Sequence, residues 1–160
     1  LVYLLGDTVE ELDGSEYLYV IHNQIGKNCP KVNLEQENRL VNCLLKLINK
    51  DYLSSATDIS EGGLGVTLAK CSLNGTGIEF KNETGLKDIY FLFSETPGRA
   101  VISFKKENEK NVTEILKEFQ ITNKLIGITQ KNVIKGTGIC TNIEEAIAAY
   151  ENGIPDRMKK

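Results

Sequence analysis

Apolar residues in several stretches of the chain recur at the three- and four-residue intervals of an amphipathic helix. The longest of these stretches predicts a helix over residues 34–50, with Asn33 as its N-cap. The same spacing predicts a second helix around residues 112–119. A shorter amphipathic run, residues 64–73, directly follows a pair of glycines and predicts a third helix.

Two further segments have the spacing of a capping box, in which Ser or Thr precedes Glu by three residues. Residues 141–144 predict the start of a helix through Tyr150, with Gly153 and Pro155 as its stop signals. Residues 8–11 predict a brief helical turn.

Short β-rich runs bounded by turn residues predict strands at residues 2–5, 54–60, 77–81, 125–129 and 133–135, the last two as a pair. The strongest strand-like pattern comes from two further apolar runs, residues 88–94 and 100–105. The loop between them contains Pro97 and Gly98, which suit a turn, so we expect these runs to form a hairpin. Helices that alternate with a largely antiparallel set of strands predict an α/β sandwich of mixed topology.

Composition limits the class of protein further. With 160 residues, 41% of them hydrophobic and 26% charged, the chain has enough apolar residues for a sizeable core and enough length for one ordinary domain, expected over residues 1–160. The net charge of −3 and the scattered basic residues argue against a nucleic-acid partner. No apolar run reaches the roughly 20 residues of a membrane helix, so we expect no membrane partner.

The four cysteines, Cys29, Cys43, Cys71 and Cys140, never form a CxxC pair, so neither a zinc site nor a disulfide framework is expected. A reducing, cytoplasmic setting fits this usage. His22 has no partner motif and reads as a loop or surface histidine. No GxSxG or GxxxxGK[ST] motif is present.

The segment most able to bind a ligand is residues 58–64, Asp-Ile-Ser-Glu-Gly-Gly-Leu, where a predicted strand passes into a helix. Free backbone N–H groups at a helix start, approached closely through Gly62 and Gly63, would favour a phosphate group. Ser60 would either donate to that ligand or cap the helix. The alternative is a capped turn that holds no ligand.

The roles of three charged residues remain open at this stage. Asp58 and Glu61 would either share a magnesium ion or remain solvated, and the second interpretation is favoured, so no metal site is assigned. Arg99, near the tip of the predicted hairpin, would contact phosphate or simply be an exposed side chain.

Residues 4–8, 11–18, 58–64 and 95–99 together resemble, in order and spacing, the C-terminal domain of the formylglycinamide ribonucleotide amidotransferase family, also called phosphoribosylformylglycinamidine synthase. This family belongs to the aminoimidazole ribonucleotide synthetase superfamily. The resemblance implies a three-layer α/β sandwich with a mixed sheet and partial ferredoxin-like topology. It covers nearly the whole chain.

The resemblance also implies a function. The complete enzyme of that family is a ligase of purine biosynthesis, which uses ATP and magnesium to activate the formamide oxygen of its ribonucleotide substrate. Ammonia from glutamine then replaces that oxygen. The implied partners are an N-terminal ATP-binding domain of the same polypeptide and a glutaminase domain or subunit, and a homo-oligomer is compatible. Neither domain fits into this chain, so we expect the chain alone to be inactive and to bind no cofactor.

Asp58, Ser60, Gly62 and Gly63 match the family motif and are the expected substrate- or phosphate-binding residues, with Arg99 as a further phosphate contact. Thr57 stands where the family motif usually has histidine, which puts any role of that imidazole in doubt. The alternatives are another superfamily member, namely an aminoimidazole ribonucleotide or selenophosphate synthetase, or a non-catalytic scaffold copy. The sequence fits a working or an auxiliary nucleotide site and a fused or separate glutaminase equally well.

Overall fold

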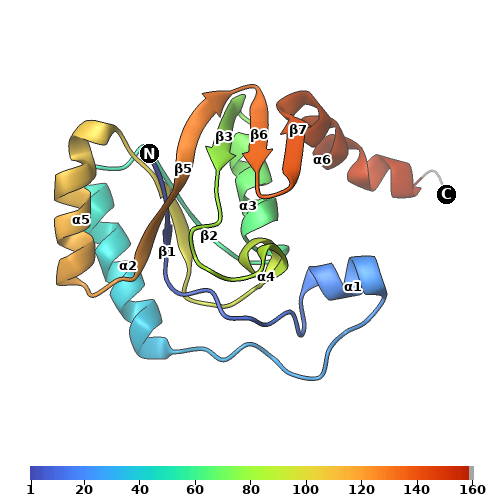
Figure 1. Ribbon diagram of the computed structural model, residues 1–160, viewed down its shortest axis with the longest axis horizontal. Coiled ribbons are helices and arrows are strands. Elements are labelled where there is room, and N and C mark those ends of the chain that lie inside the picture. The colour runs from blue at the N-terminus through green and yellow to red at the C-terminus, as the bar shows by residue number, and fades with distance from the viewer. Residues whose placement is uncertain (159–160) are drawn as a thin grey trace.

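A seven-stranded mixed sheet lies between two layers of helices in the computed structural model, which describes residues 1–158 (Figure 1). The strands are β1 (Val2–Leu5), β2 (Ser55–Asp58), β3 (Thr76–Phe80), β4 (Ala100–Ser103), β5 (Asn123–Lys131), β6 (Val133–Gly136) and β7 (Ile139–Asn142), in the spatial order β2-β4-β1-β5-β3-β6-β7. The helices are α1 (Glu16–His22), α2 (Leu34–Asn49), α3 (Gly63–Ser72), α4 (Asp88–Phe93), α5 (Glu109–Glu118) and α6 (Ile143–Met158).

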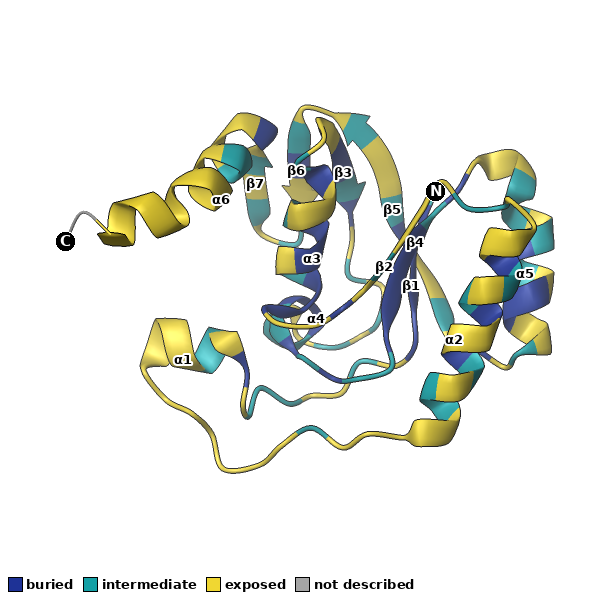
Figure 2. Ribbon diagram, turned by 180° about the vertical axis from the view of Figure 1, so that it is seen from behind, coloured by how far each residue is buried: buried dark blue, intermediate teal, exposed yellow. Residues whose placement is uncertain are grey.

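The three-layer arrangement follows from the alternation of side chains along the central strand β1. Val2 and Leu4 lie in the core cluster that contains apolar residues of α3, α4 and α6. Tyr3 and Leu5 point to the opposite face, into the cluster formed with α2 and α5. Both faces of β1 are therefore buried (Figure 2), and the predicted sandwich with a mixed sheet is confirmed.

Most neighbouring strands run antiparallel, and β3 with β6 is the parallel pair. The strands predicted at residues 125–129 and 133–135 are confirmed as β5 and β6, and both pair with β3, on its opposite edges. The third helix was predicted correctly, and its N-cap is Gly62.

The predicted hairpin of residues 88–94 and 100–105 is wrong. Residues Asp88–Phe93 form helix α4, which buries Phe91 and Leu92 against the core, while β4 lies in the sheet between β1 and β2. A short run of aromatic and branched residues suits a strand or a buried helix equally well, and here packing against the core selects the helix.

Two capping predictions also need correction. Residues 8–11 form no helical turn, because Val9 N–H donates to the Thr96 hydroxyl and Glu11 accepts from it, which draws the segment against another loop. The cap of α6 is Asn142 rather than Thr141, since its side-chain oxygen accepts from Glu145 N at 2.7 Å.

Helix α6 continues through Gly153 and Pro155, both predicted as stop signals, as far as Met158. Its last turns are exposed to solvent. A proline inside a helix removes one hydrogen bond and destabilises the helix without excluding it. The final two residues of the domain predicted over 1–160 lie outside the described residues.

Among the cysteines, Cys43 is buried, whereas Cys71 is exposed. Burial raises the pKa of the Cys43 thiol to about 11. His22 is exposed at the end of α1, as expected of a surface histidine.

The buried phenol of Tyr3 makes stability depend on pH in the alkaline range. Burial, together with donation of its hydroxyl to Glu109 at 2.9 Å, raises the pKa of Tyr3 from 10.0 to about 12. Because the folded state holds this proton more tightly than the unfolded chain, the contribution is complete below pH 10 and is lost as the pH rises towards 12. Between pH 9 and pH 11 we expect the Tyr3→Phe variant to lose about 1–2 kcal/mol less of its free energy of unfolding than the wild type, measured by urea unfolding. An equal loss in the two proteins would contradict the assignment.

Candidate functional site

The loop of residues 94–99, between α4 and β4, contains one of the four segments on which the family resemblance rests and contacts the other three. Residues 6–8 and 11 lie against it from the end of β1, Glu16 reaches it from the start of α1, and Gly62 and Gly63 reach it from the start of α3. Register explains the meeting point: Leu5 and Asp58 are both paired with Ala100, so β1 and β2 end beside the residue that follows this loop.

Arg99 organises the loop from inside. The side chain is 2% exposed, and its guanidinium donates to Thr96 O at 2.8 Å, Ser94 O at 2.5 Å and the Thr8 hydroxyl at 2.9 Å. Burial lowers the pKa of Arg99 to about 10, while the nearby carboxylates of Glu11 and Glu95 oppose that shift. Arg99 is therefore an interior residue, which contradicts the alternative of an exposed hairpin side chain, and all three of its nitrogens already donate to protein oxygens.

Small residues and hydroxyl groups complete the contact between this loop and the segment after β1. A Cβ atom added at Gly6, where φ is +84°, would lie 2.2 Å from Gly98 O, so glycine is required at this position. The Thr96 hydroxyl lies 2.7 Å from that of Ser94 and 3.2 Å from a carboxylate oxygen of Glu11. The two segments are thus held together by polar groups that are mostly buried.

The Glu95 carboxylate accepts a hydrogen bond from the backbone N–H that was expected to face a ligand. Its Oε1 accepts from Gly62 N at 2.8 Å and from Glu16 N at 2.8 Å. Gly63 N donates to Ser60 O at 3.0 Å. The expectation that both glycine amides are free is therefore wrong: one is satisfied by a carboxylate of the same chain and the other by the turn itself.

Gly63 fixes the turn against the end of α4. Its φ is +65°, and an added Cβ would lie 2.7 Å from both Leu92 O and Ser94 O. Only a residue without a side chain permits this approach. The glycines that were predicted to allow close approach of a ligand thus allow close approach of the backbone at Leu92 and Ser94.

The polar side chains of the turn face solvent. Asp58, at the end of β2, and Ser60 and Glu61, which follow it, are exposed. The Ser60 side chain does not cap α3. Of the predicted binding residues, the structure brings Asp58, Ser60, Gly62 and Gly63 to one turn. Arg99 lies inside the neighbouring loop 94–99, which contacts this turn.

Sequence reasoning missed the contributions of Glu95, Glu11 and Thr96. All three lie within or beside the segments that carried the resemblance, but their partners are remote in the sequence, so no local pattern identified them. Helix α1 was also missed, although Ser15, which accepts from Leu18 N as its N-cap, is a helix-start signal.

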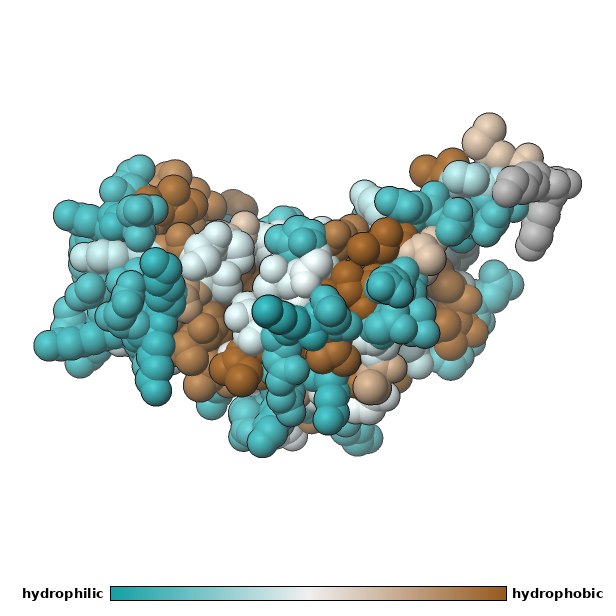
Figure 3. Space-filling view, turned by 90° about the horizontal axis from the view of Figure 1, so that it is seen from above, coloured by the Kyte–Doolittle hydropathy of each residue, from teal (hydrophilic) through white to brown (hydrophobic). Residues whose placement is uncertain are grey.

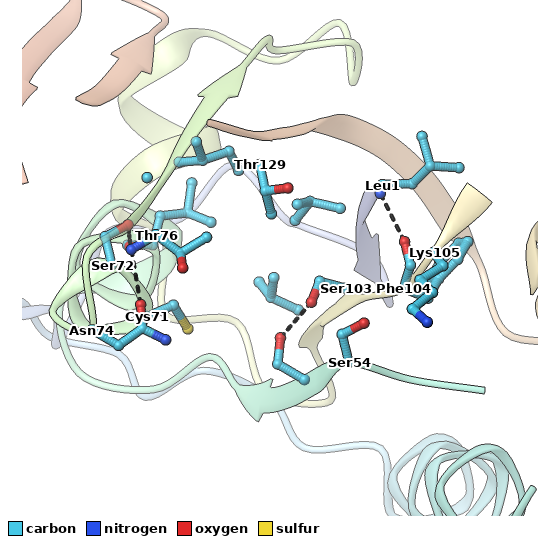
Figure 4. Close-up of a pocket in the computed structure, with 16 residues that line it drawn as sticks. Leu1, Ser54, Cys71, Ser72, Asn74, Thr76, Ser103, Phe104, Lys105 and Thr129 are labelled. Carbon is cyan, nitrogen blue, oxygen red and sulfur yellow. Dashed lines mark hydrogen bonds between the residues drawn. The ribbon is translucent and has the colours of Figure 1, made fainter. Parts of the chain in front are cut away.

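A cavity of about 550 Å³ lies at the opposite end of β1 and β4 from this site (Figure 4). Apolar residues such as Leu68, Ile78 and Val101 line it, with hydroxyl groups of Ser54, Ser55 and Ser103 at one side. It contains none of the predicted binding residues. Seen from above, the upper face of the molecule is hollowed in its middle and carries apolar side chains in several groups (Figure 3).

Within residues 1–158, no group of three or more His, Cys, Asp or Glu side chains is arranged to hold a metal ion. Over the same residues, no helix is both long and apolar enough to cross a membrane.

The sandwich and its converging glycine-rich segments define a class of protein, the C-terminal domains of synthetase-like proteins. A family model described as "AIR synthase related protein, C-terminal domain" matches residues 1–137, and the chain belongs to that family.

Particular relatives share one name. The chain is 35% identical over 131 residues to "Phosphoribosylformylglycinamidine synthase subunit PurL" of Thermoanaerobacter pseudethanolicus, and that match covers 81% of this chain and 18% of the relative. The protein of the same name from Methanocaldococcus jannaschii is 33% identical over 164 residues, which covers 99% of this chain and 22% of the relative. The chain thus spans about a fifth of the relatives that it matches.

A solved structure supports the fold independently. "T. maritima PurL complexed with FGAR" has a TM-score of 0.74 to this chain at 14% identity, and covers 91% of this chain and 27% of the solved one.

Proposed function

We propose that this chain is the substrate-side C-terminal domain of a phosphoribosylformylglycinamidine synthase, an ATP-dependent ligase that forms an amidine in purine biosynthesis. The names of the relatives support this proposal. The observation that carries it in the structure is the convergence of three family segments on the fourth, the loop 94–99, because packing alone would not require these separate motifs at one place.

Within that enzyme, we assign the turn of Asp58, Ser60, Gly62 and Gly63 to the phosphate of the ribonucleotide. The Ser60 hydroxyl is exposed at the turn, and the start of α3 supplies a favourable dipole for an anion. Arg99 supports this turn indirectly, since it holds the backbone of Ser94 and Thr96. Its proposed contribution is the shape of the loop, with any direct phosphate contact secondary.

The chemistry and the partners are proposed for the complete enzyme. ATP activates the formamide oxygen of the substrate, and ammonia derived from glutamine displaces it. We place ATP and magnesium on the N-terminal domain that would accompany this chain, since no metal ligand set gathers among the described residues. The word "subunit" in the relatives' name supports an assembly of more than one chain, and we propose a glutaminase as one partner.

A titration of the 160-residue chain with inorganic phosphate, and separately with formylglycinamide ribonucleotide, tests the assignment by amide NMR shifts. We expect saturable shifts at residues 60–64, with dissociation constants in the millimolar range for phosphate alone, because a few backbone donors compete with water. Ser60→Ala should weaken binding several-fold, and Ser54→Ala, an exposed serine at the other end of β2, should not. Unmoved amides at residues 60–64 under saturating ligand would overturn the assignment.

The satisfied amides of Gly62 and Gly63 favour a second candidate function, a scaffold copy whose turn holds no ligand and whose role is to complete an interface. This candidate predicts no response to either ligand in the same titration. The two candidates are therefore separated by one experiment.

A further inference from the structure

Residues 7–33 form an arm that leaves the sheet after β1 and returns at α2 (Figure 1). Its one helix, α1, has no buried residue, and Tyr19, Val20 and Ile21 on it are exposed (Figure 2). A helix of seven residues is unstable alone, so contacts with the rest of the molecule must hold it in place.

The contacts of α1 with the rest of the domain gather at its first turn. Glu16 N donates to Glu95 Oε1 at 2.8 Å, and the Tyr17 ring stacks on that of Phe93, with 4.8 Å between ring centroids and 25° between planes. Both partners lie at the end of α4 and the loop that follows it. The arm is therefore attached to the same loop that contacts the turn of α3.

The oxygen that holds α1 is the same oxygen that holds the turn. Glu95 Oε1 also accepts from Gly62 N at 2.8 Å, and the glutamate is half-buried. Hydrogen bonds to an ionised acceptor are about twice as strong as neutral ones. A single carboxylate thus links two segments that are distant in sequence and otherwise meet only through the loop 94–99.

We propose that Glu95 is a latch that holds α1 against the turn of residues 60–63 and that an anionic ligand at the Gly62 amide displaces. An anionic oxygen that binds the same N–H would lie beside the Glu95 carboxylate and be repelled by it, so ligand binding opposes the latched position of Glu95. Once Glu95 leaves, Glu16 N loses its acceptor, and of the two contacts named above the stack of Tyr17 on Phe93 remains. The identity of the ligand rests on the proposed function, whereas the latch rests on the contacts alone. Glu95 is a positioning residue for the arm.

Hydrogen exchange of the 160-residue chain tests the latch without any ligand. Glu95→Ala should accelerate amide exchange in residues 16–22 at least about tenfold, the size expected when a charge-assisted hydrogen bond is lost. Glu95→Gln, which keeps an acceptor oxygen, should restore part of the protection. Glu83→Ala, an exposed loop glutamate elsewhere, is the matched control. Exchange in β1 and β5 should stay unchanged in all variants.

Inorganic phosphate then tests displacement. In the wild-type chain, phosphate that shifts the Gly62 amide should also accelerate exchange in α1, and Glu95→Ala should bind phosphate about tenfold more tightly. Unchanged α1 exchange in Glu95→Ala overturns the latch, and phosphate bound at Gly62 with α1 still protected overturns displacement. A freed α1 with no phosphate shift in either protein overturns both the proposed phosphate site and displacement, and supports the latch.

Discussion

Replacement of Arg99 by methionine is expected to lower the free energy of unfolding by about 3–5 kcal/mol, although methionine can replace the apolar part of the arginine side chain. The substitution leaves the carbonyl oxygens of Ser94 and Thr96 without their donors in a buried loop. It also removes the positive charge that faces Glu11 and Glu95. Each buried acceptor without a partner costs about 1–3 kcal/mol.

Urea unfolding of Arg99→Met against Arg157→Met measures this effect. Arg157 is exposed on α6, so its replacement should change stability by less than about 0.5 kcal/mol. Arg99→Lys keeps the charge but not the planar fork, and should retain only part of the stability. A loss below about 1 kcal/mol in Arg99→Met would show that the loop does not depend on its internal arginine.

Gly63→Ala is expected to destabilise the fold by about 2–5 kcal/mol, although it adds one methyl group. The left-handed backbone at φ +65° contributes about 1–2 kcal/mol of this cost. The remainder comes from the collision of the new Cβ with two backbone oxygens, Leu92 O and Ser94 O, each 2.7 Å away. Since those atoms belong to the main chain, relief requires that the loop or the helix start moves.

Gly65→Ala is the matched control two residues further along α3. Its added Cβ would lie 3.4 Å from the Phe93 ring, an ordinary contact, and Gly65 has no positive φ. Alanine favours a helix over glycine, so this variant should gain up to about 1 kcal/mol. Equal thermal unfolding temperatures for the two variants would contradict the assigned role of Gly63.

Long periodic helices were predictable because their signal is local. Helix α2 begins after Asn33, as predicted, and buries Leu40, Cys43 and Leu47. The run at residues 88–94 failed for the opposite reason: Phe91 and Leu92 obtain their burial from α3 and the sheet, which no window of seven residues contains.

The candidate site also has a part that the sequence predicts and a part that it does not. The turn of residues 58–64 was recognisable, because a strand, two glycines and a helix follow one another in the sequence. The fate of its amides was not, because the acceptor for Gly62 N is Glu95, which the fold alone brings near. A sequence pattern can locate backbone donors, but remote side chains decide whether those donors remain available.

The position of β1 in the middle of the sheet has a consequence for synthesis on the ribosome. Val2 pairs with Ser103 on one side and with Gly127 on the other. At about 5–20 residues per second, translation from Val2 to Gly127 takes several seconds or more. Both edges of β1 are covered only after β5 has been synthesised. Throughout that interval the nascent Val-Tyr-Leu-Leu segment exposes apolar side chains and unpaired backbone groups. We therefore expect chaperones that bind nascent chains to contact it.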